Sequence, residues 1–70
     1  MSRFYLHVTN GQKTYEDHTG LDLRDRTAAE AFAQIVANDL RTDGGFDTYY
    51  VDVQDELGKH IAKIFVVPRH

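Results

Sequence analysis

The chain has 70 residues, no cysteine and a formal net charge of −3 at pH 7. Without cysteine there is no disulfide framework, no thiol nucleophile and no thiolate metal site, and the acidic balance argues against a general nucleic-acid binder, which is usually basic. No apolar run approaches the ~20 residues of a membrane span, and the start lacks the apolar stretch of a signal peptide. We therefore expect a single small domain over residues 1–70, located in the cytoplasm.

The first two predicted elements are strands. Residues 3–9 alternate between an apolar set (Phe4, Leu6, Val8) and a mixed set (Tyr5, His7, Thr9), which is the period of a strand. Asn10-Gly11 is the strongest short hairpin signal and predicts a two-residue turn. Residues 12–17 then return as a polar edge strand, in a register that places Thr9 opposite Gln12 and Leu6 opposite Tyr15.

Residues 18–26 are predicted to form a loop, held on the core by Leu21 and Leu23. A helix follows over residues 28–41, with Thr27 and Glu30 spaced as a capping box and Gly44-Gly45 after its end. Its inward face should carry Phe32 as the largest core residue, together with Ala29, Ala33, Val36 and Leu40, and with Ile35 on the flank. Residues 42–48 are expected to form a loop anchored by Phe46.

The last two elements form a second hairpin. Residues 49–54 are rich in β-branched and aromatic residues and predict a strand, Asp55 to Gly58 has the signature of a type I turn, and residues 60–67 form the last strand, stopped by Pro68. A four-residue loop places Ala62, Ile64 and Val66 on the side of Val51 and Val53, whereas a bulged three-residue loop places Ile61, Lys63 and Phe65 there. Because residues 64–67 are apolar on both faces, they are typical of a central strand that is covered on both sides.

The element order is strand, strand, helix, strand, strand. We therefore predict an α+β fold in which one helix packs on one face of a four-stranded sheet. If the first and last strands are central and parallel, the spatial order is 2-1-4-3, which is β-grasp-like and has a right-handed crossover. The alternative is the fully antiparallel order 2-1-3-4.

Several short stretches together resemble a known family. They are the opening Met1 to Val8 followed by Asn10-Gly11, the combination of Glu16-Asp17 and Gly20, the alanine-rich helix, and the stretch from Val53 to Gly58. The chain resembles a family of short proteins of unknown function, common in rhizobia and related alphaproteobacteria, that begin Met-Pro-Arg-Tyr-Phe-Phe and end with Val-x-Asp-Glu-x-Gly and a hydrophobic strand. This sequence has Ser2 where proline is usual. The resemblance implies a bacterial cytosolic protein, and it transfers no activity and no site residue.

Few residues suggest chemistry. The four histidines (His7, His18, His60, His70) show none of the local spacings of a metal site, and no Gly-x-Ser-x-Gly elbow is present. The loop carboxylates (Asp22, Asp25, Asp43, Asp47, Asp55, Glu56) fit turn chemistry and solvation. We expect no catalytic residue and no cofactor, so the chain is not expected to be an enzyme. The alternative function is a metal- or small-ligand-binding protein that uses His7 and His60 with nearby carboxylates.

The face opposite the helix is the better functional candidate. We predict an interaction surface made of Tyr5, His7, Tyr50 and Phe65, because aromatic and apolar patches usually mark association surfaces. The expected function is therefore a non-enzymatic interaction or assembly module, a homodimer through this open sheet face or through an edge strand, or a module that binds another protein partner.

Overall fold

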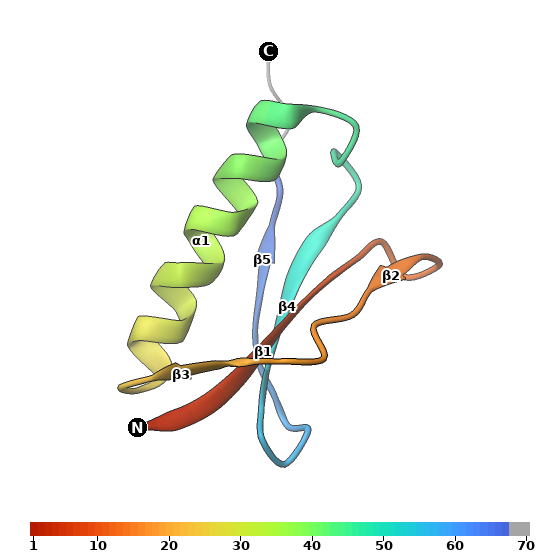
Figure 1. Cartoon of the computed structure of the whole chain (residues 1–70). Coiled ribbons are helices and arrows are strands. Elements are labelled where there is room, and N and C mark those ends of the chain that lie inside the picture. Colours follow the sequence, from red (N-terminus) through yellow and green to blue (C-terminus); the bar gives the residue numbers. More distant parts are fainter. Residues whose placement is uncertain (68–70) are drawn as a thin grey trace.

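The computed structural model describes residues 1–67, and it confirms the α+β fold class. Helix α1 packs against one face of an antiparallel sheet (Figure 1). The elements are β1 (Ser2–Thr9), β2 (Thr14–Tyr15), β3 (Leu21–Leu23), α1 (Arg26–Asp43), β4 (Tyr50–Asp55) and β5 (His60–Phe65). The predicted strand stop at Pro68 and the fourth histidine, His70, lie outside the described residues.

The strand order is β2-β1-β4-β5, every pairing is antiparallel, and β3 pairs with the first half of β1. This is the fully antiparallel alternative, and the β-grasp-like order is not observed. The central position goes to β4, whose Val51 and Val53 are completely buried. The last apolar run was expected to be a central strand, but β5 lies at the sheet edge and Phe65 is 62% exposed.

The first hairpin has a longer turn than the sequence predicts. Thr9 faces Thr14 and Val8 faces Tyr15, so the predicted two-residue register is wrong. The carboxamide oxygen of Asn10 accepts hydrogen bonds from the amides of Gln12 (2.9 Å) and Lys13 (2.7 Å). This side-chain turn competes with a two-residue hairpin, which requires a positive φ at Asn10.

The second hairpin places its side chains opposite one another as in the first of its two predicted registers. The amide of Gly58 donates to the carbonyl of Asp55 (3.0 Å), which confirms the predicted type I turn. The amide of Asp55 also donates to the carbonyl of Lys59 (2.9 Å), so the loop between the strands is the three-residue one and not the four-residue one. Val51 lies opposite Ile64 and Val53 opposite Ala62. The register shifts between Val53 and Gln54, so β5 carries one extra residue there and its start is bent.

Part of the predicted loop 18–26 is a strand. In β3, Leu23 pairs with Ser2 and Leu21 pairs with Phe4. Both leucines pack against the core, as expected. Three residues that alternate apolar, polar and apolar are enough to pair with an edge that β2 leaves free.

Helix α1 begins two residues earlier than predicted, and its N-cap is Asp25. Asp25 Oδ1 accepts from the amide of Ala28 at 2.9 Å. Thr27 therefore lies inside the helix, and the predicted capping box is wrong. Both residue types are good caps, but only Asp25 has the extended backbone that a cap needs. Within the described residues, no helix has the length and apolarity required to cross a membrane.

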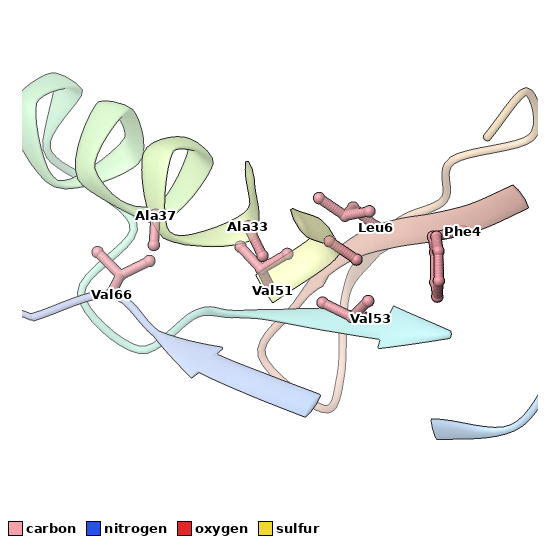
Figure 2. Close-up of a cluster of buried hydrophobic side chains, with 8 residues drawn as sticks. Phe4, Leu6, Ala33, Ala37, Val51, Val53 and Val66 are labelled. Carbon is pink, nitrogen blue, oxygen red and sulfur yellow. The ribbon is translucent and has the colours of Figure 1, made fainter. Parts of the chain in front are cut away.

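The core is built from alanines of α1 and apolar side chains of the strands. Ala29, Ala33 and Ala37 are buried, and Figure 2 shows labelled alanines of α1 directed toward the valines of the sheet side. Phe32 is 37% exposed and Ile35 57%, so Phe32 is not the main core residue. Small alanine side chains bring the helix close to the sheet, and this close approach leaves no room for a phenylalanine between them.

Candidate functional site

The four predicted interaction residues all lie on the sheet face opposite α1, which we call the open face. They form two separate aromatic pairs. The rings of Tyr5 and His7 on β1 are stacked, with centroids 6.5 Å apart and planes 8° apart. Tyr50 on β4 and Phe65 on β5 are cross-strand neighbours with centroids 5.3 Å apart. The two pairs lie on different parts of the open face and do not form one patch.

A polar row made of His7, Asp52 and Lys63 crosses the open face. Asp52 on β4 lies opposite His7 on one side and Lys63 on the other. Its side chain is only 11% exposed; one carboxylate oxygen lies 2.9 Å from His60 Nδ1, and the other accepts a hydrogen bond from the side-chain Nε2 of Gln54 (3.1 Å). The sequence analysis did not single out Asp52. The signal was present in Val51-Asp52-Val53, where an acid alternates with two core valines.

The polar row borders a shallow basin of about 440 Å³ on the open face. Its walls come from three strands and the segment after β2, and its polar side chains are Asp52, Glu16, His7, Gln54 and the hydroxyls of Thr9, Thr14 and Tyr50. The Thr9 and Thr14 hydroxyls are themselves 2.9 Å apart. The basin is therefore suited to a small ligand that forms hydrogen bonds, and it contains two carboxylates.

His7 is held by Asp17, which follows β2. The amide of Asp17 donates to His7 Nδ1 at 3.0 Å, so the neutral ring carries its proton on Nε2. The Asp17 carboxylate accepts from the amides of Leu6 (3.2 Å), Thr19 (3.1 Å) and Gly20 (2.9 Å). Asp17 thus bonds the β1 backbone at Leu6, a position that neither β2 nor β3 pairs with.

The histidines do not come together as a metal site. His18 lies 3.6 Å from Glu16 and is exposed, and His60 is paired with Asp52. Across residues 1–67, no group of three or more histidine, cysteine, aspartate or glutamate side chains is placed to hold a metal ion. Three of the loop carboxylates have structural roles: Asp22 pairs with Arg3, Asp25 caps α1, and Asp55 accepts from two turn amides.

The β5 edge is the other exposed feature. Val66 N donates to Tyr49 O at 3.1 Å, so these two residues form a hydrogen-bonded pair. Such pairs alternate along an antiparallel ladder, and the backbone groups of Lys63 and Phe65 therefore point away from β4. In the described part of the chain no strand lies beyond β5. Arg26 of α1 donates to the Ile61 carbonyl at 3.0 Å and covers only the start of the edge.

The residues that carry the family resemblance shape turns. Asp17 and Gly20 build the segment that closes the β1 edge, and Asp55 and Gly58 build the β4–β5 turn. Neither a curated protein nor a solved structure matches this chain. The model of a domain of unknown function, DUF6894, matches residues 3–67, and the chain therefore belongs to the DUF6894 family.

Proposed function

We propose that the domain is a cytoplasmic, non-enzymatic assembly module in which β5 pairs with β5 of a second copy. The observation that carries this proposal is the free edge at Lys63 and Phe65, whose outward backbone groups have no backbone partner among residues 1–67. A long unprotected edge is a template for pairing with another strand. The polar centre of the open face, by contrast, gives no reason for a second copy to lie flat on it.

Charge disfavours one register of this pairing and is compatible with another. A two-fold axis at Lys63 sets two ammonium groups directly opposite each other, which is destabilising. An axis at Phe65 pairs Phe65 with Phe65 and each Lys63 with Val67 of the second copy. Because residues 63, 65 and 67 alternate with the inward-bonded Ile64 and Val66, this register uses only outward backbone groups.

The Phe65-centred register also buries exposed apolar surface. Phe65 is 62% exposed and Val67 58%, and both approach the two-fold axis in this arrangement. Each Phe65 ring is already beside Tyr50, over which Lys63 Nζ lies at 5.2 Å from the ring centroid. The contact area is small, so the dimer is expected to be weak and to depend on concentration.

Light scattering and sedimentation from about 10 µM to about 1 mM test the dimer, because this range brackets a weak interface. The expected result is a mass that rises toward that of a dimer. Phe65→Asp should remain a monomer throughout. Leu57→Asp is the matched control: Leu57 is 90% exposed, in the β4–β5 turn and away from the β5 edge, so this variant should still dimerise. A wild-type monomer at the highest concentration contradicts the proposal.

Single cysteines test the register, since the chain has none of its own. Two Phe65→Cys chains bring their Cα atoms to about 5.5 Å, within the range of a disulfide. Two Lys63→Cys chains remain about 13 Å apart, four residues along the strand. Under mild oxidation only Phe65→Cys should cross-link; preferential cross-linking of Lys63→Cys contradicts this register.

The basin on the open face favours a second candidate function, the binding of a small polar ligand. The expected metal site loses support because, within residues 1–67, no three potential ligands are placed so that they could hold one metal ion. Asp52, Glu16 and His7 nevertheless border one basin, where they could bind a larger polar ligand. Calorimetry with Zn²⁺ and with guanidinium or alkylammonium ions tests both parts. Absence of saturable heat with every probe removes this candidate.

A further inference from the structure

A second cavity lies on the helix side of the sheet, at the C-terminal end of α1. It has a volume of about 280 Å³ and is lined by Val8, Tyr15, Leu40 and Phe46, almost entirely through apolar atoms. The hollow arises because β2 stops after two residues and because the alanine face of α1 ends at Ala37. C-terminal to Ala37, the larger side chain of Leu40 is only partly buried.

One wall of this cavity is aromatic. The Tyr15 ring centroid lies 6.3 Å from that of Phe46 and 6.1 Å from that of Tyr49, and Phe46 and Tyr49 meet edge to face at 5.1 Å. Tyr15 is 47% exposed, so the wall is open to solvent on one side. A ligand that enters on this side contacts aromatic rings that pack against one another and so hold one another in position.

A cation lies against one of the lining residues, Tyr15. Lys13 Nζ lies 4.9 Å from the centroid of the Tyr15 ring, a distance at which the ring face attracts an ammonium group. The neighbouring Tyr15 hydroxyl and, to a smaller extent, that of Tyr49 raise the pKa of Lys13. None of the four lining side chains is acidic, so this ammonium is available to an anion seated in the cavity.

We propose that this cavity binds a compact amphipathic anion, with an apolar body against Leu40 and Phe46 and a carboxylate toward Lys13. The volume is just below the ~300–1,000 Å³ of sites for drug-sized ligands, so the body is a short alkyl chain or a single aromatic ring. This inference is independent of the β5 dimer, because the cavity is lined by β1, β2, α1 and the segment before β4, and by no residue of β5.

Amide-resolved NMR titration tests the proposal with four probes: octanoate, 3-phenylpropionate, octan-1-ol and octylammonium. Either carboxylate should produce saturable shifts at Val8, Tyr15, Leu40 and Phe46. The alcohol should bind more weakly and the cation weakest. Comparing the two carboxylates distinguishes an alkyl from an aryl body.

Lys13→Gln isolates the role of the cation beside Tyr15. It should weaken carboxylate binding about 2- to 5-fold, the range of an exposed ion pair, and leave octan-1-ol unchanged. The control Lys63→Gln, on the opposite face, should change neither. Leu40→Gln should abolish saturable binding of every probe, with circular dichroism confirming the fold. Absence of saturable shifts at these residues, equal binding of octanoate and octylammonium, or unchanged octanoate binding in Lys13→Gln overturns the proposal.

Discussion

The two edges of the sheet are finished in opposite ways. Along β1, two short strands cover the ends, and Asp17 covers the gap between them by accepting from Leu6 N while its own amide bonds His7. Along β5, one side chain, Arg26, covers one carbonyl. Loop residues therefore protect the β1 edge, whereas the β5 edge stays open at Lys63 and Phe65, and this difference makes the β5 edge the candidate for pairing with another strand.

Gly20→Ala should disrupt the closed edge most. A Cβ at this position lies 2.9 Å from Arg3 Cγ and from Tyr5 Cε2, and φ is +78°. Backbone strain and steric overlap together should cost about 2–4 kcal/mol of unfolding free energy, measured by urea denaturation. The control is Gly11→Ala: φ is +90° but no atom lies within 4 Å of the new Cβ, so the cost should be about 1–2 kcal/mol. Equal losses in both variants contradict the close approach at Gly20.

Asp17→Asn should cost about 1–3 kcal/mol of unfolding free energy, because a side-chain amide cannot accept from all three backbone donors, Leu6 of β1 and Thr19 and Gly20 of the segment after β2. Burial tends to raise the pKa of the Asp17 carboxyl, but the amides of Gly20, Leu6 and Thr19 and the nearby His7 hold it below its ordinary value of 3.8.

The sign of the pH dependence follows from that lowered pKa. A carboxyl with a depressed folded pKa stabilises the protein fully above its unfolded pKa, and this stabilisation is lost as the pH falls through the folded value. The difference in unfolding free energy between wild type and Asp17→Asn should therefore be constant above about pH 5 and narrow below pH 3.8. A difference that stays constant to pH 2 would contradict the role of the charged carboxylate.

Arg26→Ala tests the single cover on the β5 edge. It removes the hydrogen bond to Ile61 O and the pair with Glu30 at 2.8 Å. Both are exposed, so the loss in unfolding free energy should be about 0.5–1 kcal/mol. Arg24→Ala is the matched control, since the Arg24 guanidinium is 3.8 Å from Asp25 and 85% exposed, and it should have no measurable effect. A loss in Arg26→Ala as large as that of Asp17→Asn would show that the two edges depend equally on side-chain cover.

Phe65→Ser should have the smallest effect on the stability of the monomer, within about 1 kcal/mol, because the side chain is already mostly exposed. In the same variant the concentration dependence of the mass should disappear. Urea denaturation at low protein concentration, where the monomer dominates, separates these two effects. A large loss of monomer stability would mean that Phe65 serves the fold rather than association.

The sequence was most informative where one local rule acts alone. The alternation in residues 3–9 placed Phe4 and Leu6 inside and Tyr5 and His7 on the open face, as observed. The Asp55–Gly58 turn was predicted correctly because its aspartate and glycine suit one turn type. The helix was recognised for the same reason, from its period and its alanines.

Errors arose where two local solutions compete. Asn10 can serve as the first residue of a two-residue hairpin turn, or its side chain can form an Asx turn. Asp25 and Thr27 are both good helix N-caps. Phe32 has the spacing of a core residue. The buried alanines Ala29, Ala33 and Ala37, however, bring the helix backbone too close to the sheet to leave room for a phenylalanine ring. For the candidate site, the sequence placed Tyr5, His7, Tyr50 and Phe65 on one face of the sheet, while the position of Asp52 among them depended on the neighbours of β4.

By itself, the amino-acid sequence determined the α+β class, the helix, four of the five strands and the two faces of β1, because periodicity and turn chemistry act over a few neighbouring residues. Only the tertiary structure decided which strand is central, where Asp17 closes an edge and why β5 stays open. These features depend on contacts between segments far apart in the chain. The apolar strands could each occupy the middle of the sheet, and β4, with the buried Val51 and Val53, is the one that lies between β1 and β5.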